Sequence, residues 1–120
     1  MYVGIGGFIG AALRYGISGW AQKQFGPAFP WGTFIVNAIG CLFIGYIMTY
    51  SVEIGLISTE LRLFLVTGIL GGLTTFSTLS YESVALFHNG SVWLGIWNLA
   101  VNLIVGLAAV MAGIAAARIM

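Results

Sequence analysis

Charged residues are scarce in this sequence. Only 6% of its 120 residues are charged, whereas 60% are hydrophobic. A water-soluble domain of this size could hardly hide so much apolar surface from solvent. The scarcity of charge therefore excludes a soluble protein and predicts a multi-pass protein of the cell membrane, with the lipid bilayer as its surroundings.

The few charges are also dispersed. The basic residues Arg14, Lys23, Arg62 and Arg118 lie far apart, and the formal net charge is only +1. Nucleic-acid binding needs basic residues gathered on one surface, so we expect no nucleic-acid partner.

Residues that carry catalytic or metal chemistry are nearly absent. Cys41 is the only cysteine, which excludes an intrachain disulfide and leaves too few thiolates for a structural metal site. His88 is the only histidine and there is no aspartate, so a Ser-His-Asp constellation cannot form. We therefore expect no enzyme.

Long apolar segments fill the chain instead. Charges, prolines and polar turns divide them at about residues 2–22, 31–52, 59–87 and 92–118. Each is long enough to cross a bilayer and is apolar nearly all round, which excludes an interfacial amphipathic peptide. The sequence predicts an all-α membrane protein with four transmembrane helices in a single domain, residues 1–120, whose first helix is not a cleaved signal.

Four spans would place both termini on one side of the membrane, together with the connection between the second and third helices. That side carries Arg62 and Arg118, the other carries Lys23, and Arg14 lies within the first helix. The charge bias between the two sides is close to nil, so the positive-inside rule permits insertion in both orientations.

Eighteen glycines indicate close helix approach, because glycine otherwise weakens helices. The pairs Gly6 with Gly10 and Gly68 with Gly72 each share one helix face. Two interpretations stay open: packing inside one protomer, or a seam between two chains.

The polar stretch GGLTTFSTLS at residues 71–80 lies within the third segment. Gly71 and Gly72 have low helix propensity, and hydroxyl residues then crowd what should be the bilayer centre. This predicts a helix broken in mid-membrane, whose freed carbonyls would suit a small hard cation such as sodium. The alternative is an unbroken helix whose hydroxyls bond back to the preceding turn. The hydroxyl residues are Thr74, Thr75, Ser77, Thr78 and Ser80.

Neutral hydrogen-bond donors lie on the neighbouring segments. Asn37 is in the second, and Asn98 and Asn102 share one face of the fourth at i, i+4 spacing. Phe76 adds an aromatic ring whose positive edge could meet an anion. The asparagines suit either hydrogen bonds between helices or the passage of a small anion, and Phe76 suits either a pore wall or a lipid-facing position.

The glutamates lie at the edges of the segments. Glu53 and Glu60 flank the second connection, and Glu82 falls late in the third segment, at a pore mouth or at the membrane interface. Arg14 either reaches the membrane surface or attracts anions. No pair of inward acids is available for a proton relay, which disfavours coupled transport.

The whole chain resembles the Fluc (CrcB) fluoride channels. The resemblance rests on GGFIGAALRY at 6–15, WGTFIVNAIGCLFIG at 31–45, GILGGLTTFSTLSYE at 68–82 and the polar fourth segment. It implies a passive fluoride-selective channel that exports fluoride from a microbial cell and protects against its toxicity. It also implies an antiparallel, dual-topology homodimer with two pores and a central sodium ion.

The resemblance also implies residue roles. The sodium ligands would be the carbonyls of Gly71 and Thr74, Asn37 the pore asparagine and Phe76 the first pore phenylalanine, with the neighbouring hydroxyls as pore wall. This sequence departs from the family where Leu79 replaces a second phenylalanine. The polar track of the fourth helix, usually tyrosine and serine, would fall on Asn98 and Asn102.

Two other functions are compatible with a small four-helix membrane protein. A small dual-topology multidrug transporter has a similar length, but that class needs a glutamate in its first helix and none is present. A nonconducting subunit of a paralogous pair would show helix packing without ion flux.

Overall fold

A computed structural model describes residues 1–55 and 57–119, and within these ranges the chain is helical with short connections and no strand. It is elongated, with principal extents of 49 × 30 × 22 Å. The elements are α1 (Tyr2–Phe25), α2 (Trp31–Thr49), the π-helical η1 (Tyr50–Ile54), α3 (Thr59–Arg62), the π-helical η2 (Leu63–Leu70), α4 (Gly71–Leu73), α5 (Ser77–His88) and α6 (Val92–Ile119).

Local sequence chemistry sets the helix boundaries. α1 ends at Gly26, whose φ of 86° belongs to the left-handed region that favours glycine. Gln22 braces the connection to α2, since its side chain donates to the Gly26 carbonyl and accepts from the Gly32 amide, both at 3.2 Å. Ser58 caps α3 by accepting from the Leu61 amide at 3.1 Å, and α3 begins at Thr59, close to the expected start of the third segment.

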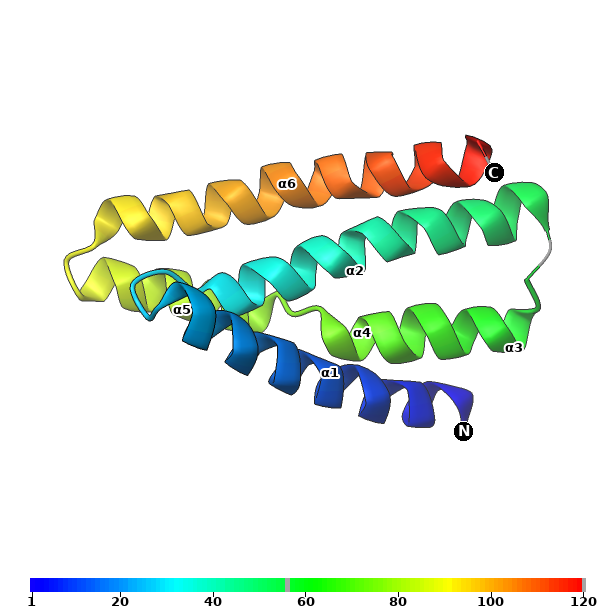
Figure 1. The fold of residues 1–120 in the computed structure, drawn as a ribbon, viewed down its shortest axis with the longest axis horizontal. Coiled ribbons are helices and arrows are strands. Elements are labelled where there is room, and N and C mark those ends of the chain that lie inside the picture. Colours follow the sequence, from blue (N-terminus) through cyan, green and yellow to red (C-terminus); the bar gives the residue numbers. More distant parts are fainter. Residues whose placement is uncertain (56, 120) are drawn as a thin grey trace.

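Both termini lie at the same end of the molecule, beside the end of η1 and the start of α3 (Figure 1). The connections from α1 to α2 and from α5 to α6 lie at the opposite end. At the terminal end, the Arg118 guanidinium donates two hydrogen bonds to the Glu53 carboxylate, at 3.1 and 2.9 Å. The chain therefore passes along the long axis an even number of times.

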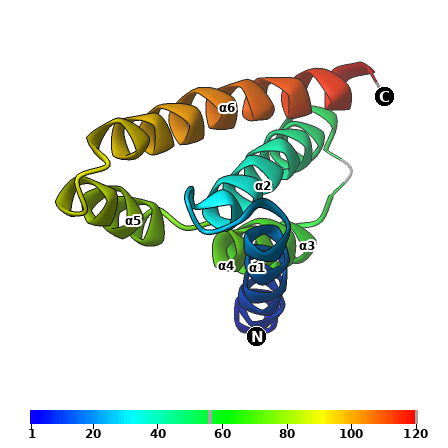
Figure 2. The same ribbon diagram turned by 60° about the vertical axis from the view of Figure 1, so that its left-hand side comes forward.

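The second helix lies at the centre of the bundle. Figure 2 shows α2 between α6 on one side and α1 with α4 on the other. Its most extensive packing is against α6, while α1 packs mainly against η2 and α4. The fully buried Val36 contacts Leu70 and Leu73 in the core, so α2 supports the third helical segment where its polar stretch begins.

The glycine pairs pack inside the protomer. A Cβ added to Gly68 would lie 2.9 Å from the Gly6 Cα, and one on Gly72 would lie 2.7 Å from the Gly7 carbonyl oxygen. A Cβ on Gly10 would collide with the Ile69 carbonyl. These glycines therefore let the backbones of α1 and the third segment touch, as small residues do between membrane helices.

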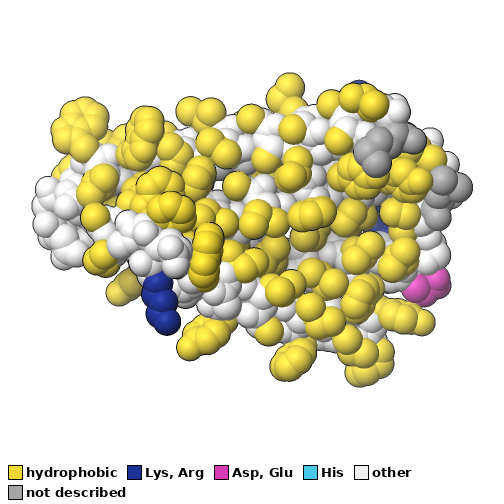
Figure 3. Space-filling view, in the orientation of Figure 1, with side chains coloured by type: hydrophobic (Ala, Val, Ile, Leu, Met, Phe, Trp, Pro, Cys, Tyr) yellow, Lys and Arg dark blue, Asp and Glu magenta, His cyan; other side chains and the backbone are white. Residues whose placement is uncertain are grey.

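Three helical stretches are long and apolar enough to cross a membrane: Trp31–Ile54, Thr59–His88 and Val92–Ile119. α1 is comparably long but carries Arg14, Gln22 and Lys23, and it is not among the three. Hydrophobic side chains cover most of the visible face in Figure 3, and few charged side chains interrupt them. The chain is thus a multi-pass membrane protein with three to four apolar helices.

Candidate pore and ion site

Residues 74–76 interrupt the helical path between α4 and α5. Thr74 is extended, with φ −87° and ψ 156°, and helix resumes at Ser77. The Thr74 hydroxyl donates back to the Leu70 carbonyl at 2.9 Å. The back-bonding considered as an alternative to a break therefore occurs at this side chain, beside backbone that has left the helix.

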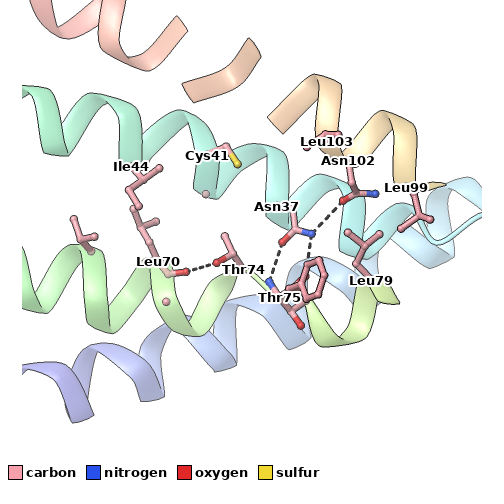
Figure 4. A pocket seen from close by; sticks show the side chains of 14 residues that line it. Asn37, Cys41, Ile44, Leu70, Thr74, Thr75, Leu79, Leu99, Asn102 and Leu103 are labelled. Atoms are coloured by element: carbon pink, nitrogen blue, oxygen red, sulfur yellow. Dashed lines mark hydrogen bonds between the residues drawn. The ribbon is translucent and has the colours of Figure 1, made fainter. Parts of the chain in front are cut away.

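Asn37 supplies the hydrogen bonds that the backbone loses at the interruption. Its Oδ1 accepts from the Thr75 amide at 2.9 Å, and its Nδ2 donates to the Thr75 carbonyl at 3.1 Å (Figure 4). Inside a bilayer such backbone groups have no bulk water to bond, so a side chain must satisfy them. Asn37 thus hydrogen-bonds both the backbone amide and the backbone carbonyl of Thr75.

The carbonyls of Gly71 and Thr74 have lost their usual helical donors. In an unbroken helix they would accept from the amides of Thr75 and Thr78. The Thr75 amide instead donates to Asn37 Oδ1, and the Thr78 amide donates to Thr75 Oγ1 at 3.2 Å. Both carbonyls therefore lack these two donors, and carbonyl oxygens are hard ligands of the kind that small hard cations prefer.

No cluster of three or more His, Cys, Asp or Glu side chains that could hold a metal occurs among residues 1–55 and 57–119. The predicted ligands of a cation at Gly71 and Thr74 are backbone carbonyl oxygens.

The three asparagines meet through hydrogen bonds. Asn37 Nδ2 also donates to Asn102 Oδ1 at 3.1 Å, as Figure 4 shows. Asn102 Nδ2 donates to the carbonyl oxygen and to Oδ1 of Asn98, at 2.8 and 3.1 Å. The side chains of α2 and α6 thus join the interrupted segment in one buried polar network.

Ser83 completes this network, and the sequence interpretation missed it. Asn98 Nδ2 donates to Ser83 Oγ at 3.0 Å, and the Ser83 hydroxyl donates to the Leu79 carbonyl at 2.9 Å. A small polar residue one helical turn after Leu79 was the available signal. Helical periodicity places Ser83 on a face of α5, but it does not identify Asn98 of α6 as its hydrogen-bond partner.

A cavity of about 540 Å³ opens on one side of the interruption. Its wall is mainly apolar, and Phe76, with 78% of its surface exposed, and the buried Leu79 both contribute to it. Several predicted site residues share the wall, namely Asn37, Gly71, Thr74, Thr75 and Asn102. Asn98 is fully buried and is not in the wall.

A second, more polar cavity has a volume of about 780 Å³. Arg14, Lys23, Thr78 and Glu82 line it, and Thr75 lines both cavities. Thr75 of the interruption thus contacts both a mainly apolar cavity and one lined by charged residues.

Three further polar side chains follow the interruption on α5, namely Ser77, Ser80 and Glu82. Glu82 Oε1 is buried beside the buried Thr33, and among residues 1–55 and 57–119 it has no partner at hydrogen-bond geometry. Ser77 is exposed and Ser80 half-buried, and neither lines these two cavities.

Known proteins resemble this chain over its full length. Residues 1–114 match the model of the family described as CrcB-like protein, Camphor Resistance (CrcB). A protein named fluoride-specific ion channel FluC from Clostridium perfringens is 52% identical over 120 residues, which is 100% of this chain and 94% of the relative.

Two further proteins of the same name are also similar to this chain. The one from Clostridium novyi is 50% identical and covers 98% of this chain and 91% of its own length. The one from Chloroflexus aurantiacus is 46% identical, with 97% and 92% covered. A family match across 114 residues and full-length relatives at about half identity establish that this chain belongs to the CrcB family.

Proposed function

We propose that this chain is a fluoride-selective ion channel, not an enzyme, which lets fluoride leave the cell passively and so protects against fluoride toxicity. The observation that carries this proposal is the 52% identity, over the entire chain, with a protein named fluoride-specific ion channel FluC. The neutral donors around residues 74–76 support it, because they suit a small anion without bringing a fixed negative charge.

The proposed pore wall runs past the interruption. Asn37 and Thr75 would supply amide and hydroxyl groups, and Phe76 would present its positive ring edge to fluoride. The exposure of Phe76 toward the apolar cavity supports this role. The other residues assigned to the polar route are Ser77, Thr78, Ser80, Asn98 and Asn102.

The proposed assembly is an antiparallel, dual-topology homodimer of four-span chains whose third helix is broken in mid-membrane. The 24 residues of α1 would extend about 36 Å, enough for a hydrocarbon core of about 30 Å. The interruption falls near the middle of Thr59–His88, which supports its placement at the bilayer centre. Both termini share one end and the loop charges are balanced, which supports insertion in either orientation.

A structural sodium ion is proposed at the dimer centre, held by the carbonyls of Gly71 and Thr74. The support is that the Thr75 and Thr78 amides, the usual helical donors to these carbonyls, bond elsewhere. Replacing sodium by a bulky organic cation should slow fluoride flux from proteoliposomes. Equal rates in the two salts would count against this ion.

Fluoride efflux from liposomes containing the purified protein tests the function. A fluoride electrode should record rapid efflux, and chloride efflux should be far slower. A small multidrug transporter would instead exchange a cationic drug for protons. Verified dimers that pass no fluoride would refute the self-sufficient channel and favour a nonconducting subunit of a paralogous pair.

A further inference from the structure

The hydrogen bonds around Asn37 form a chain that runs in one direction. Each side chain donates to the next acceptor, from Asn37 to Asn102, then to Asn98, then to Ser83. The last donor is the Ser83 hydroxyl, which bonds the Leu79 carbonyl. This hydrogen-bond chain is composed of Asn37, Asn102, Asn98 and Ser83. It begins on α2, where Asn37 bonds the Thr75 backbone, and it ends on α5.

Its far end fixes its direction. A serine hydroxyl has one hydrogen, and Ser83 donates it in a hydrogen bond to the Leu79 carbonyl. The Ser83 oxygen can therefore only accept from Asn98, which turns Nδ2 of Asn98 toward α5 and its Oδ1 toward Asn102. The same constraint then passes from Asn102 to Asn37.

Burial makes a reversed amide costly. Ser83 and Asn98 are 1% and 0% exposed, and Asn102 is 8% exposed. Reversal of any one amide would set two donors or two acceptors against each other, and water has little access to satisfy them. The orientation at Ser83 is thus transmitted along the buried side chains.

We infer that Ser83 and Asn98 are positioning residues, which act together with the Thr75 backbone to hold the orientation of the Asn37 amide at the helix interruption through this hydrogen-bond chain. Ser83 need not touch the permeating ion, because its effect reaches the ion through Asn98, Asn102 and Asn37. The inference rests on the proposed function only where its test reads out transport.

The direct test follows the side-chain amide of Asn37 by NMR in protein labelled with ¹⁵N at asparagine. Ser83→Thr and Ser83→Val have the same shape, and only threonine keeps the hydroxyl. The Asn37 amide resonance should move in Ser83→Val and in Ser83→Ala but stay near its original position in Ser83→Thr. An unmoved resonance in Ser83→Ala, or equal movement in the threonine and valine variants, would overturn the inference.

A double-substitution cycle tests the same point by transport. Ser83→Ala should lower fluoride efflux roughly 10-fold, in line with one buried amide left unsatisfied. In an Asn37→Ser background, Ser83→Ala should cause no further loss, since the group it positions is already gone. An equal loss in both backgrounds would show that Ser83 acts independently of Asn37. The NMR result stands even where the parent protein passes no fluoride, so failure of the proposed function is distinguishable.

Discussion

At the residue scale, the Asn37 amide serves backbone and side chain at once. Both Nδ2 hydrogens are engaged, one by the Thr75 carbonyl and one by Asn102 Oδ1, while Oδ1 holds the Thr75 amide. An anion that receives a hydrogen bond from Asn37 must therefore exchange with one of these partners. A permeation route past Asn37 thus couples ion contact to the state of the hydrogen-bond chain.

Asn37→Asp should reduce fluoride efflux by about 100-fold or more, because it removes both donors and adds a negative charge facing the anion. The matched control is Asn89→Asp, since Asn89 is exposed in the turn before α6. Efflux from proteoliposomes measures both. Full activity of Asn37→Asp would remove Asn37 from the pore.

Phe76→Ile should strongly lower fluoride efflux while leaving the dimer intact, because isoleucine is apolar but has no ring edge for an anion. Phe8→Ile is the control on α1, since Phe8 is 76% exposed and Phe76 is 78% exposed. Electrode measurements and size-exclusion chromatography separate flux from assembly. Similar efflux in the two variants would contradict a pore role for Phe76.

At the element scale, the close approach of α1 to η2 and α4 depends on glycine. Gly10 has no room for a Cβ, whereas nothing lies within 4 Å of a Cβ placed on Gly4 of the same helix. Small residues at such contacts allow the backbone packing that associates helices in lipid, where the hydrophobic effect contributes little. The absence of side chains at these glycines therefore lets α1 pack closely against the third segment.

Gly10→Ala should lower the midpoint of thermal unfolding in detergent by several degrees, because the added methyl collides with the Ile69 carbonyl. Gly4→Ala should leave the midpoint unchanged or raise it, since alanine favours helix over glycine by about 1 kcal/mol. An unchanged midpoint in both variants would mean that α1 does not pack closely against η2 at Gly10.

Sequence patterns predict the helices better than they predict the side-chain contacts between helices. The start of the third segment near residue 59 and the apolar character of the segments follow from short-range chemistry. The partner of Asn98 does not, because periodicity places a side chain on a face without saying which neighbouring helix rotates toward it. The π-helical winding of η1 and η2 likewise has no signal in composition, and the roles assigned to Phe76 and Gly71 stay predictions.

At the scale of the whole molecule, balanced charge leaves orientation undecided. The termini end carries Glu53 paired with Arg118, and Glu60 and Arg62 lie on α3 near the same end. A protein with so little bias can be tipped by a few added charges. We therefore expect that a few added charges would set the orientation of this chain.

Adding lysine at the opposite end, as Asn89→Lys with Ser91→Lys, should force a single orientation and reduce fluoride efflux from cells when expressed alone, because antiparallel pairs become rare. Glu60→Lys with Ser58→Lys should do the same in the reverse sense. Co-expression of the two should restore efflux. Full efflux from each variant alone would argue against an antiparallel dimer.

The shared location of the two termini constrains any attempt to join two copies into one polypeptide. In an antiparallel pair, the C-terminus of one copy and the N-terminus of the other lie on opposite faces of the bilayer. A short soluble linker would enforce a parallel pair. A functional tandem gene would thus have to encode an additional membrane-crossing segment between its halves.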